Sequence, residues 1–589
     1  MEKRWTLNEE VDSEIVDKLS KSLNINKVLA KLLVGRGIDN YEEAKKFFRP
    51  SLDSLHDPFL MLNMDKAIDR IDYAIANEQN ILIYGDYDVD GTTSVALVYS
   101  YFKNYFDNNN LNSKIDFYIP DRYKEGYGIS FDGIDYAENN KQSLIIALDC
   151  GIKSVDKIEY ANSKNIDFII CDHHTPGDIV PDAAAVLDPK QKDCNYPYKE
   201  LSGCGVGFKL LQGFNQQNNI KFATLEPYLD LVAISIAADI VKVDGENRVL
   251  AHFGLKRLNT NPRPGIEWIL NYSNINRQKK TSPEGFVFDR ELSISDIVFT
   301  IAPRINAAGR MDTGKRSVDL LICTRMDKAK NIAENIDKYN SKRRTLDTGT
   351  TEQALEIIAN NETLKNAKST VVYHETWHKG VLGIVASRLT ETYYRPTIVL
   401  ALVDGIYTGS ARSVKGFDVY EAIDSCNHLL DSFGGHMYAA GLSLKEENID
   451  EFVRLFEKYV SENISLLSLR PEITIDSYLS IDDITDKFYN VLKQFAPFGP
   501  GNMSPVFISD GLVDTGYARV VGKNHLKMQV CYPENRMTSF NGIGFGLADK
   551  YSVINTKLPF EVAYSINENV WKERVSLQFM IKDIRISEH

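Results

Sequence analysis

The sequence lacks long apolar runs, closely spaced cysteines and a surplus of basic residues. No segment reaches the roughly 18 consecutive apolar residues that a membrane-spanning helix needs. The amino terminus, MEKRWTLNEEVDSE, mixes charges where a signal peptide would carry an uninterrupted apolar stretch. We therefore expect a cytoplasmic protein without a membrane segment.

Cysteines are few and scattered, and no two of them form a C-x-x-C pair. The seven are Cys150, Cys171, Cys194, Cys204, Cys323, Cys426 and Cys531. This spacing suggests neither a zinc knuckle nor a disulfide framework. We expect reduced thiols that are mostly packed in the interior.

Basic residues are outnumbered, with 68 lysines and arginines against 81 acidic residues and a net charge of −13. A protein that coats nucleic acid by bulk electrostatics needs a broad basic surface, so this mode is disfavoured. A narrow basic groove remains compatible with the composition. Carboxylates gathered around bound cations would also fit, although solvated surface glutamates explain most such surpluses.

A chain of 589 residues is longer than one hydrophobic core usually serves, so several domains are expected. From Ile81, short apolar runs such as ILIYG, SLIIALD and IDFIICD alternate with polar segments of helical length. This alternation predicts parallel βαβ units and a doubly wound α/β sheet. A second α/β region begins at STVVYHE, and glycine-rich β-like runs beyond about residue 465 suit a small β-barrel.

The proposed boundaries follow these changes of pattern. We expect a helical accessory region (1–60), a catalytic α/β domain (61–315), a helical connector (316–362), a second α/β domain (363–464) and a barrel (465–589). The connector has helical periodicity and no proline, which predicts a long helix or a helix pair. An ordinary packed helix of one domain is the alternative.

Three carboxylates stand at alternate positions in ILIYGDYDVDGTTS, at Asp86, Asp88 and Asp90. In an extended segment, residues two apart lie on the same side. We expect the following glycine to allow a turn, and Thr92 or Thr93 to begin a helix. Carboxylates crowded in this way repel one another, so a cation or a proton must compensate them.

Further polar side chains follow the next apolar runs. LIIALDCG ends in Asp149, and IDFIICDHH ends in Asp172, His173 and His174. Because ligands of open α/β sheets bind beyond the carboxyl ends of the strands, these segments should converge on one crevice. Asp239 lies in the apolar run LVAISIAADIVKV, where an unpaired carboxylate would be costly to bury.

Carboxylates with one or two imidazoles suit a pair of divalent ions, with Mn²⁺ favoured, Mg²⁺ possible and Zn²⁺ disfavoured without thiolates. Two ions roughly 4 Å apart can bind a scissile phosphate and acidify a shared water. Each strand-end aspartate alone is more often structural. The ordered set of four, each at the end of an apolar run, favours a catalytic metal site.

At these residues the sequence resembles the DHH phosphoesterase superfamily, named for the triplet Asp172, His173 and His174. The segments IPDRYKEGYG, GCGVGFKL, PRINAAGRM, WHKGVLGIVASRL, GSARS and FGGHMYAAG make it similar to the RecJ-type single-strand-specific 5′→3′ DNA exonucleases within it. The similarity runs from about Asn63 to the carboxyl terminus. It implies a DHH domain and a DHHA1-type domain joined by a long helix, followed by an oligonucleotide-binding (OB) fold.

The resemblance implies a dinuclear metal site and a set of side chains that hold it. The metal ligands would be Asp88, Asp90, Asp149, His173 and Asp239, with Asp86 and His174 either behind the ligands or against the phosphate. His174 is counted with these ligands among the catalytic residues. Asp86 is counted among the metal-binding residues.

The resemblance also implies a grip on the 5′ end of the strand. Its candidates are Ser410 and Arg412 in GSARS, with Arg122 reaching across a cleft between the two α/β domains. Guanidinium groups bind phosphate oxygens bidentately and a hydroxyl adds a donor, although a surface ion pair is the alternative. Further expected contacts are Arg304, Asn306, Arg310, Gly434, Gly435 and His436.

The OB fold would stack and hold single-stranded DNA. Its candidates are Tyr517, Arg519, Lys523, His525 and Lys527, for each of which a solvated barrel face is nearly as good an explanation. A helicase or a single-strand-binding protein is a possible partner. A monomer would suffice.

These expectations describe an exonuclease of DNA repair and recombination that releases 5′-mononucleotides. One rival is a DHH enzyme acting on very short oligonucleotides, cyclic dinucleotides or pyrophosphate, which the barrel disfavours. A second is a catalytically silent replication scaffold, which the complete set of acidic and histidine positions disfavours. The third is a protein that uses the carboxylates for stability alone.

Overall fold

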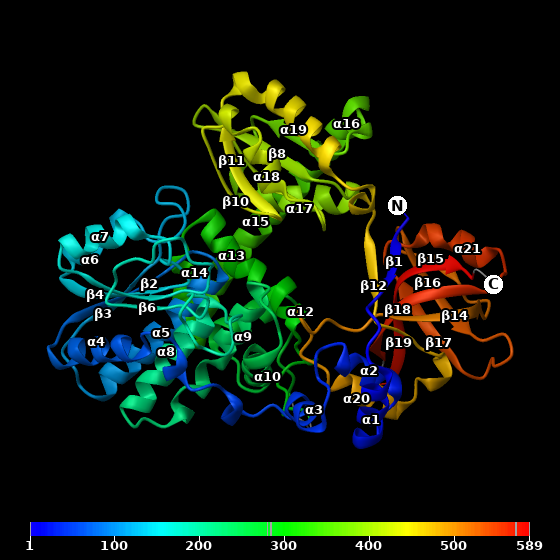
Figure 1. Ribbon diagram of the computed structural model, residues 1–589, viewed down its shortest axis with the longest axis horizontal. Coiled ribbons are helices and arrows are strands. Elements are labelled where there is room, and N and C mark those ends of the chain that lie inside the picture. Colours follow the sequence, from blue (N-terminus) through cyan, green and yellow to red (C-terminus); the bar gives the residue numbers. More distant parts are fainter. Residues whose placement is uncertain (1, 280, 283–284, 572–573, 588–589) are drawn as a thin grey trace. The chain divides into compact units, whose positions relative to one another are not determined.

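The computed structural model describes residues 2–279, 281–282, 285–571 and 574–587 (Figure 1). Its contacts group the chain into two compact units. One unit consists of Ile38–Asn340 with Leu492–Ser504, and the other of Met1–Gly37, Ser341–Val491 and Pro505–His589. The first contains the predicted catalytic domain.

A five-stranded sheet of parallel strands forms the centre of the catalytic domain. Its strands are β2 (Asn80–Gly85), β3 (Ile115–Tyr118), β4 (Gln142–Leu148), β5 (Asp167–Cys171) and β6 (Ala185–Leu187), in the order β3-β2-β4-β5-β6. The order reverses between β2 and β4, the point at which ligands bind in sheets of this kind. The predicted doubly wound sheet is confirmed.

Helices cover both faces of this sheet, which is why its strands are almost uninterrupted apolar runs. Leu144, Ile146 and Leu148 of β4 pack on one side, and Ile145 and Ala147 on the other. The first side is covered by α4 (Met64–Ala76), α5 (Val89–Asn108), α8 (Gly203–Gln217) and α9 (Leu229–Ala238), and the second by α6 (Phe131–Asn139) and α7 (Val155–Ser163).

The remaining helices of this unit extend the first side. They include α3 (Tyr41–Phe48), α10 (Gly245–Thr260), α11 (Pro264–Asn271), α12 (Ile294–Asp296), the π-helix η5 (Ile297–Ile301), α13 (Ala302–Met311) and α14 (Lys315–Ile322). The predicted long helix is α15 (Met326–Ala359), which is continuous over 34 residues. Both Asn340 and Ser341, where the chain passes from one unit to the other, lie within it.

The second α/β domain has a mixed sheet in the order β10-β11-β9-β8-β7. Only β7 and β8 pair in parallel, and the other neighbours are antiparallel. The strands are β7 (Thr370–His374), β8 (Thr397–Val403), β9 (Ile406–Arg412), β10 (Ser432–His436) and β11 (Ala439–Leu444). The helices are α16 (Glu362–Asn366), α17 (Leu382–Tyr393), α18 (Val419–Asp424) and α19 (Ile449–Asn463).

The carboxyl-terminal strands close into a barrel, because β14 pairs with both β18 and β16 and completes the ring β14-β18-β19-β17-β16. A closed five-stranded barrel is the architecture of an OB fold. The strands are β13 (Ser477–Tyr478), β14 (Phe507–Asp514), β15 (Arg519–Val521), β16 (His525–Cys531), β17 (Ser539–Gly544), β18 (Phe560–Trp571) and β19 (Arg574–Ile586). The helices are α20 (Asp486–Lys493) and α21 (Tyr551–Asn555).

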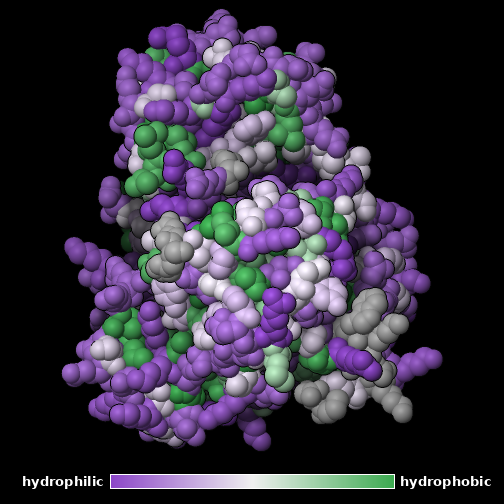
Figure 2. Space-filling model, turned by 90° about the vertical axis from the view of Figure 1, so that its right-hand side faces the viewer, coloured by the Kyte–Doolittle hydropathy of each residue, from purple (hydrophilic) through white to green (hydrophobic). Residues whose placement is uncertain are grey.

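The amino-terminal segment contains a strand that the sequence did not predict. After β1 (Arg4–Leu7) come the expected helices α1 (Ser13–Leu23) and α2 (Lys27–Val34). Strand β1 pairs in parallel with β12 (Glu472–Ile475), a partner too distant in sequence for local pattern to reveal. Among the described helices, none combines the length and apolarity required to span a bilayer. On the face drawn in Figure 2, hydrophilic side chains predominate and hydrophobic ones form small separate groups.

Candidate metal centre

The loop after β2 carries the first carboxylates, but not in the extended form that their spacing suggested. Asp86 follows the strand directly, Asp88 is the N-cap of α5, and Asp90 already lies in the first helical turn. The Asp88 carboxylate accepts a hydrogen bond from the Gly91 N–H at 3.0 Å. The expected extended run through Asp90 is therefore wrong, because the capping aspartate starts the helix early.

Gly91 has a different role from the turn that was expected. The helix begins at Val89 rather than at Thr92 or Thr93, so Gly91 lies inside it. A Cβ atom on Gly91 would stand 2.4 Å from the Asp86 carbonyl oxygen. The glycine therefore allows α5 to approach the strand end closely enough to bring its carboxylates together.

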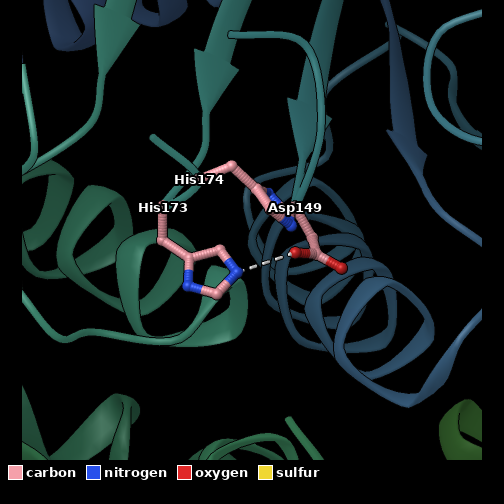
Figure 3. Close-up of side chains that lie close together, drawn as sticks. All are labelled: Asp149, His173 and His174. Atoms are coloured by element: carbon pink, nitrogen blue, oxygen red, sulfur yellow. Dashed lines mark ion pairs between the residues drawn. The ribbon is translucent and has the colours of Figure 1, made fainter. Parts of the chain in front are cut away.

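His173 is the side chain on which the other ligands converge. Its Nε2 atom lies 3.2 Å from Asp149 Oδ1, 3.6 Å from Asp239 Oδ2 and 3.8 Å from Asp90 Oδ2. Figure 3 shows Asp149 and the two histidines turned toward one another at the ends of their strands. The predicted convergence of four distant segments on one sheet edge is present.

The tautomer of His173 indicates what occupies the space between these atoms. Nδ1 lies 3.0 Å from the Leu201 carbonyl oxygen, which can only accept, so Nδ1 carries the hydrogen. Burial lowers the pKa of His173, which keeps the ring neutral. Nε2 makes no hydrogen bond within the described part of the chain and presents a lone pair to carboxylate oxygens. Lone pairs facing one another in this way need a cation or a proton between them, and this donor set fits divalent metal ions.

The carboxyl groups show the same need for a counter-charge. Burial, reinforced by Asp88, raises the pKa of Asp86 to about 8. Burial, reinforced by Asp90 and Asp88, raises that of Asp239 to about 8. The pKa of Asp149 is also raised, again mainly by burial. Oδ2 of Asp86 is buried without a hydrogen bond to any residue that the structure describes, as expected for an atom that faces a metal site.

Asp90 is held by groups that the sequence did not point out. Its oxygens accept hydrogen bonds from the N–H groups of Gly203 (2.7 Å) and Cys204 (2.8 Å), at the amino terminus of α8. The Ser235 hydroxyl donates a third at 2.7 Å. The partial positive charge at a helix amino terminus and its free N–H groups make α8 a suitable support for this carboxylate. The motif GCGVGFKL contains Gly203 and Cys204, but only the fold shows that their N–H groups bind Asp90.

His174 faces outward and is held in place by two neighbours. Its Nδ1 lies 2.7 Å from Asp172 Oδ1, and its side chain is 44% exposed. Burial disfavours the imidazolium, but the hydrogen bond and charge of Asp172 outweigh it and raise the pKa of His174. The Tyr127 hydroxyl lies 3.3 Å from His174 Nε2 and donates to the Asp149 carbonyl. Sequence reasoning missed Tyr127, which stands between two glycines in the quoted IPDRYKEGYG.

Asp188 is a further carboxylate that the sequence reasoning missed. It follows β6, the strand next to the one that ends in Asp172, and is fully buried. Burial raises its pKa to about 7, and its Oδ2 makes no hydrogen bond among the described residues. In AAAVLDPK an aspartate follows an apolar run, which is the same pattern that marked the other strand ends.

The predicted arginines of the catalytic domain divide into two kinds. The Arg122 guanidinium lies over the Tyr87 ring, 4.7 Å from its centroid, beside the loop that carries Asp86. Both Arg122 and Arg310 act electrostatically on Tyr87. Arg304 instead pairs with Asp337 of α15 at 2.9 Å, an interaction that joins two helices. Asn306, also on α13, is partly exposed.

The predicted DNA contacts of the second α/β domain lie on two strands, β9 and β10, which flank β11 in the sheet. Arg412 Nη1 donates to Ser410 Oγ at 2.9 Å on β9. Gly441 of β11 pairs with Ser410 on one side and with Gly434 on the other, and Gly435 and His436 continue β10. A Cβ atom on Gly383 would lie 2.9 Å from Arg412 Nη2, so this glycine leaves room for the guanidinium.

A parallel α/β sheet with carboxylates and imidazoles at its carboxyl edge defines the class of this protein as a DHH-type phosphoesterase. The DHH family, N-terminal domain model matches residues 80–236. The DHHA1 domain model matches residues 347–462, and the RecJ OB domain model matches 475–583.

The chain belongs to the RecJ family. It is 34% identical over 588 residues to the single-stranded-DNA-specific exonuclease RecJ of Bacillus subtilis, covering 99% of this chain and 71% of that protein. The Escherichia coli protein of the same name is 33% identical over 578 residues, with 95% of each chain covered. The fold is similar to RecJ of Thermus thermophilus in complex with Mn²⁺, with a TM-score of 0.81 and 24% identity, covering 100% of this chain and 80% of that one. A solved structure of exonuclease RecJ bound to manganese is 26% identical, with a TM-score of 0.58, covering 71% of this chain and 100% of that one.

Proposed function

We propose that this protein is a metal-dependent exonuclease that degrades single-stranded DNA from the 5′ end and releases 5′-mononucleotides. The observation that carries the proposal is the unprotonated Nε2 of His173, which faces three carboxylates from separate segments. Such a centre serves phosphodiester hydrolysis. Identity of 33–34% over nearly the whole chain to proteins named single-stranded-DNA-specific exonucleases supports the substrate.

The metal ligands in this proposal are five carboxylates and one imidazole. They are Asp86, Asp88, Asp90, Asp149, His173 and Asp239. Bound divalent ions would polarise the scissile phosphate and acidify a water molecule. We propose Mn²⁺ as the preferred ion, because imidazole among carboxylates suits it better than Mg²⁺, which prefers an all-oxygen shell.

His174 is proposed to contact the scissile phosphate. Asp172 fixes its ring through Nδ1, and Nε2 can exchange its 3.3 Å contact with the Tyr127 hydroxyl for a hydrogen bond to a phosphate oxygen. The raised pKa of His174 favours the protonated, donating form. Arg122 and Arg310, beside Tyr87, are proposed to bind the backbone near the centre.

The 5′ polarity is proposed to come from Ser410 and Arg412. A guanidinium and a hydroxyl that already touch one another form a preorganised pair of phosphate donors. Gly434, Gly435 and His436 lie on the same sheet, where glycine lets a phosphate approach the backbone. A terminal phosphate held there would fix which end of the strand enters the reaction.

The barrel is proposed to bind the strand farther from its end. Arg519 and Lys527 are directly opposite one another on β15 and β16. Like charges in this position are unfavourable unless an anion lies between them. Tyr517 is 64% exposed next to them and could stack on a base, with Lys523 and His525 nearby in the hairpin.

A helicase or a single-strand-binding protein is proposed as a partner, because a single-strand-specific enzyme depends on another activity to expose its substrate. The proposed metal ligands all lie on one chain, so a monomer would suffice. The pathway served would be repair or recombination.

The proposal is tested with end-labelled single-stranded and double-stranded DNA incubated with Mn²⁺, Mg²⁺ or a chelator. We expect mononucleotides from the 5′ end of single strands with either ion, more with Mn²⁺, and none with the chelator. The Asp149→Ala variant should be inactive, which would exclude a contaminating nuclease. Faster hydrolysis of dinucleotides than of long strands would instead favour the short-oligonucleotide enzyme.

A further inference from the structure

We propose that the segment Phe495–Asn502 is a positioning element for Asp239 and so sets the affinity of the metal centre. The segment precedes β14 in sequence, but its contacts place it in the catalytic unit. The inference rests on the proposed role of Asp239 as a metal ligand. It assigns no catalytic role to the segment itself.

The segment has a fixed shape of its own. The Asn502 side chain, which is 2% exposed, donates from Nδ2 to the carbonyls of Phe495 at 2.8 Å and Pro497 at 2.9 Å. The backbones of Gly499 and Asn502 exchange two hydrogen bonds, at 2.8 and 3.0 Å. Buried groups satisfied in this way hold one conformation, since any other leaves them unpaired.

Arg248 of α10 anchors the segment to the catalytic unit. Its guanidinium is almost fully buried and lies 3.7 Å from the centroid of the Phe47 ring. It donates to a ring of carbonyl oxygens, those of Phe47, Gln494, Phe495, Ala496 and Pro497. A buried charge needs such partners, so the segment and the arginine depend on one another.

The anchored segment in turn binds the loop that follows Asp239, through a hydrogen bond and a packing contact. The Val243 N–H donates to the Pro500 carbonyl at 2.6 Å. Val243 is fully buried, and a Cβ atom on Gly499 would lie 2.5 Å from its Cγ2 atom. Glycine at 499 therefore leaves room for the Val243 side chain beside this hydrogen bond.

Only three residues separate Val243, which the segment binds, from the metal ligand Asp239. Asp239 is fixed on its other side by α9, where its N–H donates to the Ser235 carbonyl at 2.9 Å. Between the two anchors, Ile240 has a φ of +59° and a side chain that is 67% exposed. A β-branched residue keeps this unfavourable conformation only where its surroundings impose it. Release of Val243 would let the loop relax and move Asp239 away from His173.

The test compares Gly499→Ala, Val243→Ala and the double variant, because truncating Val243 removes the atom that the new methyl group would strike. Gly349→Ala is the control, since a Cβ atom there meets nothing within 4 Å. Mn²⁺ binding to metal-free protein is measured by titration with detection of free Mn²⁺, together with the melting temperature. DNA cleavage is measured separately.

We expect Gly499→Ala to weaken Mn²⁺ binding about tenfold, as loss of an outer support of a metal ligand typically does. The double variant should regain most of the affinity, and Gly349→Ala should bind like the wild type. In cleavage assays, the loss should disappear at saturating Mn²⁺. If Gly499→Ala does not fold, Asn502→Ser replaces it, with the same weaker binding expected.

Unchanged Mn²⁺ affinity in a folded Gly499→Ala or Asn502→Ser protein would overturn the inference. So would a loss that Val243→Ala does not relieve. Because binding is measured without DNA, a wild type that binds Mn²⁺ but does not cleave would refute the proposed function and leave this inference standing.

Discussion

Single residues around Asp90 show how neighbours that bind neither metal nor substrate can set the geometry of a centre. Two backbone N–H groups and the Ser235 hydroxyl fix the orientation of its carboxylate. Ser235 Oγ also lies 2.6 Å from the hydroxyl of Ser202, the N-cap of α8, and can accept a hydrogen bond from it. A ligand held by three donors loses little freedom when an ion binds, which favours binding.

Removal of the Ser235 hydroxyl should therefore weaken the centre. We expect Ser235→Ala to raise the Mn²⁺ concentration for half-maximal cleavage about tenfold, with the maximal rate less affected. Ser94→Ala is the matched control, because Ser94 Oγ lies 3.4 Å from Asp90 Oδ1 and contributes little. Equal effects of the two substitutions would contradict the assignment.

The raised pKa values of Asp86 and Asp239 predict how metal and pH act together. The ordinary value is 3.8 and the folded value is about 8 for both, so between these values the folded protein binds more protons than the unfolded chain. The contribution of these two groups to the stability of the metal-free protein is therefore lost as the pH rises through this window. Divalent ions replace those protons, so their stabilising effect should grow with pH.

We expect the difference in melting temperature between Mg²⁺-saturated and metal-free protein to be larger near about pH 9 than near about pH 6. Differential scanning fluorimetry of both forms measures it. In Asp239→Asn, one of the two carboxyls is gone and the pH dependence should shrink. A difference that is constant or larger at the lower pH would be evidence against this account.

At the scale of elements, α8 links two ligands through its first turn. Its amino terminus binds Asp90, while a Cβ atom on Gly203 would lie 2.6 Å from Asp149 Cβ. Gly205, two residues on, would place a Cβ atom no closer than 3.4 Å to its neighbours. The helix can therefore approach both aspartates only because its first residue has no side chain.

Gly203→Ala should consequently push α8 away from both ligands. We expect a loss of about 1–3 kcal/mol in stability, as overpacking typically causes, with most of the cleavage activity lost. Gly205→Ala should leave both nearly unchanged. Melting temperatures and cleavage rates of the two variants, measured side by side, check this; similar losses in both would show that helix rigidity rather than contact with Asp149 matters.

At the scale of the whole molecule, a net charge of −13 requires DNA binding to depend on localised basic groups. The hairpin β15–β16 offers such a group in Arg519, Lys523 and Lys527. If they contact phosphates, each releases counterions when DNA binds. Affinity for long strands should then depend on these residues, while hydrolysis of a dinucleotide should not.

We expect the triple glutamine variant at these positions to bind long single strands more weakly. The slope of log K against log salt should fall by about 0.7 for each lost contact. Arg536→Gln, an exposed arginine of the same domain, serves as the control. Fluorescence anisotropy at several salt concentrations measures the slope, and an unchanged slope would place the DNA elsewhere.

The sequence by itself determined the class of sheet, a helical connector, a small barrel and the carboxylates with His173 at one edge. It could do so because buried parallel strands can be recognised as apolar runs, and because the carboxyl ends of parallel strands lie at the same edge of the sheet. The sequence did not predict interactions in which one of the two partners comes from a distant segment of the chain. The pairing of β1 with β12 and the support of Asp90 by α8 and Ser235 leave no local signal.

The tertiary structure alone decided how each ligand is held. Contacts between residues far apart in the chain decide several features of the site. These are the start of α5 at Val89, the hydrogen bond from Val243 to Pro500 and the position of Tyr127 beside His174. A sequence specifies which side chains can bind a metal, because that is a property of their chemistry. Whether they meet at bonding distance depends on packing and hydrogen bonds, and these exist only once the chain has folded.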